Sequence, residues 1–170
     1  MAIVAETKDW TWVLERPCAE CGYEPSALEA TAVGEEVLAS VPRWRAALAR
    51  PDARERPDDA TWSVLEYACH VRDVLVLFAQ RSRSMREQDD PEFANWDQDA
   101  TAVEDRYDQQ DPAVVADEID RAAHAYAAEL AAVTDWQRTG RRSNGSVFTA
   151  DTLTRYAWHD LAHHLHDVDA

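Results

Sequence analysis

The chain has 170 residues, 46% of them hydrophobic, which is enough to bury the core of one folded domain. Its net charge at pH 7 is −16, which argues against binding to nucleic-acid phosphates and against adsorption to an anionic membrane. No apolar run approaches the roughly 20 residues of a membrane span, and the first nine residues show no signal peptide. Three cysteines, an odd number, fit a reduced cytoplasmic protein.

Residues 1–25 are predicted to form an irregular N-terminal arm, followed by a single helical domain over residues 26–170. The arm contains Cys18-x-x-Cys21, which resembles half of a zinc knuckle. The third cysteine, Cys69, lies within a predicted helix, so no second cysteine pair completes such a site. We therefore expect Cys18 and Cys21 to be packed and reduced, without a metal of their own. A reactive dithiol or a shared metal is the alternative.

Glycine is scarce, at 4 residues, and residues that favour helices are abundant. Their apolar periodicity predicts an all-α fold, a four-helix bundle with helices over residues 26–50, 61–87, 112–133 and 149–168. Thr149 is placed to cap the last helix.

The connection over residues 88–111 is long and acidic, so a crossover is expected between helices two and three. Phe93 and Trp96 are predicted to anchor it on the bundle. A small hairpin is expected before the last helix, with its turn at Asn144-Gly145.

Four of the six histidines lie in the last predicted helix. His159 and His163 are four residues apart and stack on one face, a common way for one helix to offer two imidazoles to a metal ion. His166 falls near the same stripe, whereas His164 points elsewhere. A third ligand is expected from His70, which lies on a mostly apolar face of the second helix.

The apolar stripe of the last helix supports a different interpretation. It consists of Leu153, Ala157, Leu161 and Val168, and His159 and His163 lie roughly opposite it. On this pattern alone, the two histidines either bind a metal or face solvent.

The Trp62-Ser63 start of the second helix, its His70 and the closing His159-x-x-x-His163 together resemble the DinB/YfiT-like superfamily of metalloenzymes, over residues 26–168. The resemblance implies a DinB/YfiT-like bundle whose metal triad is His70, His159 and His163, in a cleft at one end. It also implies a homodimer. Related proteins include mycothiol-dependent maleylpyruvate isomerase and bacillithiol or mycothiol S-transferases.

Three imidazoles with an open position are typical of a catalytic metal site, and imidazole suits zinc and nickel. The resemblance implies a metal-dependent S-transferase or isomerase that uses a low-molecular-weight, mycothiol-like thiol on a small electrophile. A metal-dependent hydrolase that uses bound hydroxide is the first alternative, and a non-catalytic metal-binding bundle is the second. The related His-x-x-x-His-x-Glu pattern has Leu165 in place of its glutamate here, so an oxygenase role is not supported.

Supporting roles are assigned to residues near the predicted ligands. Tyr67 and Tyr156 fall close to the histidine faces and are expected to donate hydrogen bonds to a substrate. Arg141 or Arg142 is expected to hold a carboxylate of the thiol. Asp73 or Asp160 is expected to orient an imidazole.

Overall fold

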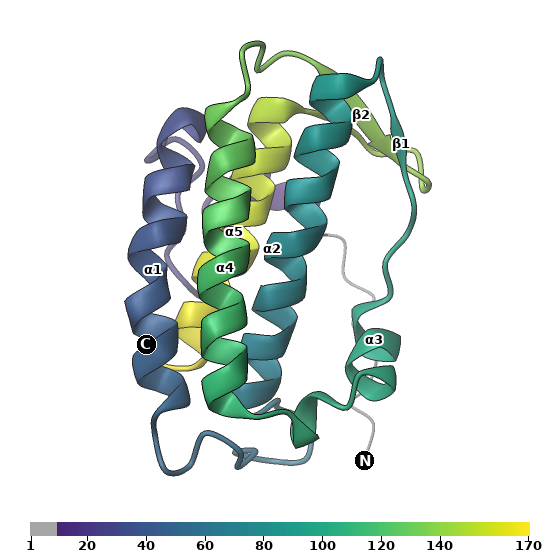
Figure 1. The fold of residues 1–170 in the computed structure, drawn as a ribbon. Helices are drawn as coiled ribbons and strands as arrows, with labels where there is room; N and C mark the ends of the chain where they lie inside the picture. The colour runs from purple at the N-terminus through teal and green to yellow at the C-terminus, as the bar shows by residue number, and fades with distance from the viewer. Residues whose placement is uncertain (1–9) are drawn as a thin grey trace.

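The computed structural model describes residues 10–170, so the first nine residues of the predicted arm lie outside the described part. Four long helices form a bundle: α1 (Val33–Leu48), α2 (Val64–Glu87), α4 (Pro112–Ala131) and α5 (Ala150–Asp167) (Figure 1). In Figure 1, α1 and α5 run downward, whereas α2 and α4 run upward. Because α2 and α4 are parallel, the segment that connects them must run back along the length of the bundle. This arrangement confirms the predicted four-helix fold with a long crossover.

The crossover contains β1 (Glu92–Phe93), the short helix α3 (Gln98–Glu104) and the 3-10 helix η3 (Tyr107–Gln109). Phe93 is buried, as predicted, and Trp96 is partly buried against the core. The crossover therefore lies against the bundle beside α2 (Figure 1).

A three-stranded sheet lies beside the upper end of α2 in Figure 1. β2 (Thr139–Arg142) pairs in parallel with β1 and antiparallel with β3 (Val147–Thr149), which confirms the predicted hairpin. A Cβ atom added at Gly140 would lie 2.6 Å from the ring of Phe93, so only glycine lets this strand approach the crossover so closely.

Local hydrogen bonds explain where the helices begin. Ser63 and Thr149 each form a capping box at the start of α2 and α5. The predicted start of the first helix at Ser26 is wrong: the Ser26 hydroxyl donates to the Glu24 carboxylate, and no helix begins at this residue. The helix begins only at Val33, after the short 3-10 helix η2 (Ala30–Ala32).

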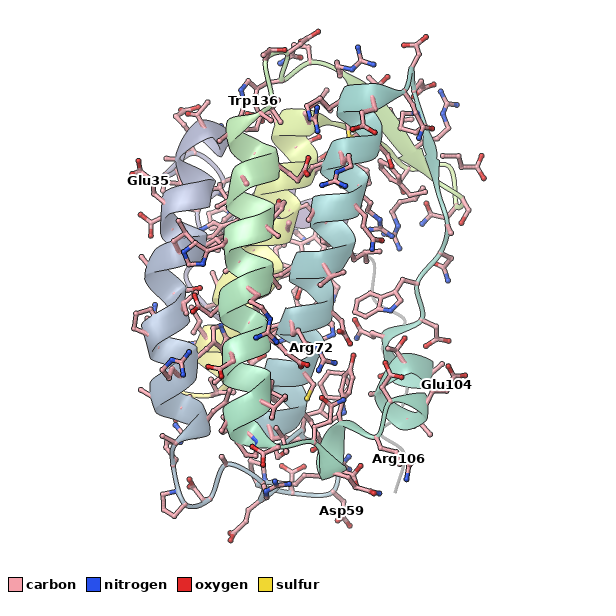
Figure 2. All side chains as sticks on the ribbon, viewed as in Figure 1. Glu35, Asp59, Arg72, Glu104, Arg106 and Trp136 are labelled. Atoms are coloured by element: carbon pink, nitrogen blue, oxygen red, sulfur yellow. The ribbon has the colours of Figure 1, made fainter. Side chains whose placement is uncertain are left out.

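The core fills the space between the four long helices, and Trp44, Leu65 and Tyr126 are among its largest fully buried side chains. Toward solvent, polar contacts join the helices. Arg72, labelled in Figure 2, donates from α2 to Glu118 of α4 at 2.8 Å. Within residues 10–170, every helix is too short or too polar to span a membrane.

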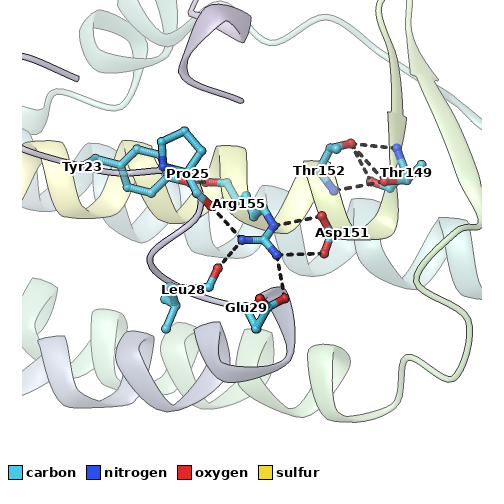
Figure 3. A network of polar contacts seen from close by, with 8 residues as sticks. All are labelled: Tyr23, Pro25, Leu28, Glu29, Thr149, Asp151, Thr152 and Arg155. Atoms are coloured by element: carbon cyan, nitrogen blue, oxygen red, sulfur yellow. Dashed lines mark hydrogen bonds and ion pairs between the residues drawn. The ribbon is translucent and has the colours of Figure 1, made fainter. Parts of the chain in front are cut away.

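The described part of the arm lies along α5 and begins with the 3-10 helix η1 (Thr11–Leu14). Arg155 of α5 fixes the end of this arm and the segment that follows it (Figure 3). It donates hydrogen bonds to the carbonyl oxygens of Pro25 and Leu28 and pairs with Glu29. The Tyr23 hydroxyl donates back to the carbonyl oxygen of Arg155 at 3.3 Å. The arm therefore covers the face of α5 that points away from the bundle core.

Candidate metal centre

Helix α5 carries two pairs of possible metal ligands, and each pair is spaced four residues apart. His159 and His163 form one pair, and Asp160 and His164 form the other. The pairs are offset by one residue, which rotates them by about 100° around the helix. Each pair therefore faces a different neighbour.

Asp160 and His164 meet His70 of α2. One possible ligand atom from each of the three residues lies within 4.8 Å of the others. Oδ1 of Asp160 lies 3.3 Å from Nε2 of His70 and 3.1 Å from Nε2 of His164. We call these three residues the α2–α5 group.

Burial and ion pairing set the charges of the α2–α5 group. Burial lowers the pKa of His70, so its imidazole is neutral. Burial also acts to lower the pKa of His164, but hydrogen bonds to Asp160 and Asp167 outweigh it and raise this pKa to about 9. Burial favours protonated Asp160, yet its hydrogen bonds with His164 and His70 hold its pKa well below the usual range. The protonated His164 thus balances the charge of Asp160, and a metal ion bound at its Nε2 would take the place of the proton.

Aromatic side chains surround the α2–α5 group. The ring of Trp96, from the crossover, stacks on His70 with centroids 5.4 Å apart, and Trp62 lies 5.5 Å from the same imidazole. Tyr67 lies 5.1 Å from His164, and burial raises the pKa of its hydroxyl to about 12. Tyr67 therefore stays protonated and can donate a hydrogen bond.

The other pair on α5 faces the arm. Possible ligand atoms of Cys18, Cys21, His159 and His163 all lie within 4.8 Å of one another. Sγ of Cys18 is 3.7 Å from Nδ1 of His163. Burial lowers the pKa of both imidazoles, that of His159 to about 4, so both are neutral near pH 7. We call these four residues the arm–α5 group.

The structure does not bring the predicted triad of His70, His159 and His163 together in either group. His164, which was expected to point elsewhere, takes the place beside His70. His166, the other residue near the predicted stripe, is exposed.

The rotation of α5 explains this difference. Leu161 is buried against the bundle, and at about 100° per residue Asp160 and His164 border it, whereas His159 and His163 lie across the helix from it. The apolar stripe in the sequence carried this signal, and it favoured Asp160 and His164 as the partners of His70. Metal binding by His70, His159 and His163 stays a prediction. The arrangement of the side chains does not favour it, because His70 lies in one group and the other two histidines lie in the other.

The predicted substrate-binding residues are divided between the two ends of the bundle. Tyr67 lies beside the α2–α5 group. Tyr156 instead packs against Phe78 and Phe148, with ring centroids 6.2 and 5.5 Å apart.

Arg141 and Arg142 belong to β2, beside the far end of α2 (Figure 1). His70 lies near the start of α2, roughly 25 Å away along the helix axis. Arg141 pairs there with Asp90. The structure therefore does not place either arginine at the histidines.

Of the two carboxylates expected to orient an imidazole, only Asp160 contacts histidines. Asp73 accepts hydrogen bonds from Arg72 and from the Tyr107 hydroxyl. Sequence spacing did not separate these roles, because both aspartates lie close to a histidine along their own helices.

The spacing of the ligand atoms in the α2–α5 group fits a metal ion. A tetrahedral ion with metal–nitrogen and metal–oxygen distances near 2.0–2.1 Å holds its ligand atoms about 3.3 Å apart. The separations of 3.3 and 3.1 Å around Asp160 are close to this value. The His70 atom that faces this volume is Nε2; its other nitrogen, Nδ1, is buried without a hydrogen-bond partner within the described residues.

Comparison with known families identifies the fold. A family model of the DinB superfamily matches residues 35–168. The chain belongs to the DinB superfamily. The structure is also similar to that of YfiT from Bacillus subtilis, with a TM-score of 0.70 and 19% sequence identity over 86% of this chain and 90% of that one. The YfiT structure is described as "a probable metal-dependent hydrolase with an unusual four-helix bundle topology". No curated protein matches the chain.

Proposed function

We propose that this DinB-superfamily protein is a metal-dependent hydrolase whose metal is held by the α2–α5 group. The observation that carries the proposal is the meeting of His70, Asp160 and His164, from two helices, around one small volume. The likeness to YfiT supports the fold on which such a site is built, and its description as "a probable metal-dependent hydrolase" supports this class of reaction.

Two imidazoles and one carboxylate are the ligands of catalytic zinc in several metalloproteases, and they leave a position open. A zinc or nickel ion held in this way supplies Lewis acidity and lowers the pKa of a coordinated water or thiol.

The protein's own residues prepare the site. Asp167 lies 2.8 Å from Nδ1 of His164 and fixes its ring, leaving Nε2 directed toward Asp160. Trp62 and Trp96 keep bulk water from His70, whose exposed fraction is 1%. The Tyr67 hydroxyl can donate a hydrogen bond to a substrate oxygen beside His164.

Thiol transfer by the same group is the second candidate, and the superfamily resemblance supports it. The two arginines expected to hold a carboxylate of the thiol lie at the other end of the bundle, so this reaction would require a different anchor for the thiol. Water, the nucleophile in hydrolysis, needs no such anchor. The geometry therefore favours hydrolysis over thiol transfer.

The test combines metal binding with activity. Metal-free protein is titrated with zinc or nickel and assayed on a panel of chromogenic esters, amides and phosphoesters, and separately for consumption of mycothiol with a small electrophile. His70→Ala, Asp160→Asn and His164→Ala should each abolish metal-dependent activity. His124→Ala, on an exposed imidazole of α4, is the matched control.

Two results would count against the proposal. Metal-dependent thiol transfer without hydrolysis would replace it with the second candidate. Metal-free protein that is as active as metal-loaded protein would reject both candidates.

A further inference from the structure

We infer that the arm–α5 group, Cys18, Cys21, His159 and His163, is a tetrahedral Cys2His2 zinc site that joins the N-terminal arm to α5. This site is separate from the metal centre of the proposed function. It replaces the expectation from the sequence that the two cysteines hold no metal of their own.

The spacing of the four residues is that of structural zinc sites. Cys-x-x-Cys supplies two thiolates from one turn, and His-x-x-x-His supplies two imidazoles from one helical face. In the sequence, the cysteine pair lacked a second cysteine pair. The fold supplies a histidine pair in its place, because the arm crosses α5 beside His159 and His163.

The distances agree with zinc coordination. Zinc bonds of about 2.3 Å to sulfur and 2.0–2.1 Å to nitrogen place the two ligand atoms about 3.6 Å apart in a tetrahedron. Sγ of Cys18 and Nδ1 of His163 are 3.7 Å apart. Because all four ligand atoms fall within 4.8 Å of one another, small rotamer changes suffice to close the site.

A buried nitrogen of His159 without a hydrogen-bond partner also indicates a metal ion. Nε2 of His159 is buried and has no hydrogen-bond partner within the described residues, and the exposed fraction of this residue is 4%. The rings of Trp10 and Tyr23 pack on this imidazole at 5.5 and 5.1 Å. A neutral imidazole enclosed by aromatic rings would gain a partner if its free nitrogen bound a metal.

Two carboxylates lie near the nitrogen of His163 that faces away from Cys18. When Nδ1 of His163 faces Cys18, its Nε2 lies 3.4 Å from Glu20 and 3.7 Å from Asp167. A carboxylate behind a ligating histidine fixes its tautomer and strengthens its bond to the metal.

Charge and access also suit zinc. Two thiolates neutralise the charge of a divalent ion, which reduces the cost of burying it. A groove lined by Cys21, Tyr23, Trp158 and Ala162 opens to solvent beside Cys21. Four protein ligands leave no open position, so this site holds the arm in place and does not carry out a reaction.

The experiment uses the full chain, purified without a histidine tag under reducing conditions. Zinc is measured by mass spectrometry and then replaced by cobalt(II), whose thiolate charge-transfer absorption reports sulfur ligands. The wild type should show this absorption. Cys18→Ser, Cys21→Ser and His159→Ala should lose it or weaken it several-fold. Cys69→Ala should keep it, because the Cys69 thiol lies on α2, donates to the Tyr107 carbonyl oxygen and does not belong to the group.

A second measurement uses only the wild type, so its result does not depend on whether the variants fold. Cys18 and Cys69 are buried and Cys21 is partly exposed, so Ellman's reagent reports mainly on Cys21, which should be almost unreactive in the zinc-loaded protein. A strong zinc chelator should make the Cys21 thiol reactive while the helical circular-dichroism signal remains. A reactive Cys21 thiol before chelation, a Cys18–Cys21 disulfide, or folded protein whose cobalt spectrum lacks thiolate absorption would each overturn the inference.

The two metal proposals fail independently. His70→Ala should remove the metal of the α2–α5 group and leave the thiolate–cobalt absorption unchanged. If His70→Ala changes neither metal content nor activity, the proposed function fails while the zinc inference stands. If Cys18→Ser changes neither zinc content nor absorption, the zinc inference fails while the proposed function stands.

Discussion

The carboxylate of Asp167 lies 2.8 Å from Nδ1 of His164, one turn back along α5. Its other oxygen lies 3.7 Å from Nε2 of His163. The Asp167 carboxylate, near the end of the helix, therefore lies close to one histidine of each group. The two groups share this support, although their ligands face different neighbours.

Asp167→Asn should weaken metal binding at both groups, by about 10- to 100-fold at the α2–α5 group and by less at the arm–α5 group, where the contact is longer. An amide orients an imidazole less firmly than a carboxylate does and adds no negative charge. Competition with chelators of known affinity measures both sites. Asp169→Asn is the matched control, since it lies two residues on, in a left-handed conformation that asparagine tolerates. Equal affinity in Asp167→Asn and wild type would exclude this role.

Trp96→Ala should expose His70, because the indole covers the imidazole from the crossover. We expect faster modification of His70 by diethylpyrocarbonate in metal-free protein, located by peptide mass mapping. The free energy of unfolding should fall by about 2–3 kcal/mol, somewhat less than for a fully buried tryptophan. Trp136→Ala is the control, since this partly buried residue lies at the upper end of the bundle (Figure 2). It should reduce stability without changing the reactivity of His70.

Arg155→Met should loosen the arm, because it removes the donors to the carbonyl oxygens of Pro25 and Leu28 (Figure 3). The loss should be about 2–3 kcal/mol in the free energy of unfolding, as for hydrogen bonds from a charged donor. Hydrogen exchange of residues 23–29 should accelerate. Glu29→Gln should have almost no effect, since the Glu29 side chain is 78% exposed. Unchanged exchange in Arg155→Met would show that the arm is held by other contacts.

Glu66→Gln should make the free energy of unfolding less dependent on pH, because Glu66 belongs to the capping box of α2. Burial acts to raise the pKa of Glu66, but hydrogen bonds from Arg56 and Ser63 outweigh it and lower this pKa below its reference of 4.5. A carboxylate with a lowered pKa stabilises the fold above pH 4.5, and that contribution is lost as the pH falls through the folded-state pKa.

The wild type should therefore exceed Glu66→Gln by about 1–2 kcal/mol in the free energy of unfolding at pH 7. The difference should shrink in acid below pH 4.5. Urea denaturation across this range measures it, with the exposed Glu104→Gln as the control. A difference that stays constant with pH would rule out the ionised capping box as its source.

The sequence by itself determined that four long helices form, apart from the start of the first, together with their crossover and the chemistry available on α5. Ser63 and Thr149 cap their helices through hydrogen bonds within one turn, and the hairpin turn at Asn144-Gly145 is equally local. The superfamily resemblance rested on such local patterns as well, and the family match confirms it. Patterns of this kind can be read from sequence because the interacting residues are a few positions apart.

Only the tertiary structure decided which residues meet. The run His159-Asp160-Leu161-Ala162-His163-His164 contains two ligand pairs offset by one residue. The rotation of α5 directs Asp160 and His164 toward His70, and the path of the arm brings Cys18 and Cys21 to the other pair. Packing of Leu161 against the bundle and the hydrogen bonds of Arg155 to the arm set these two features. Both depend on contacts between residues far apart in the chain, so spacing within a single helix could not fix them.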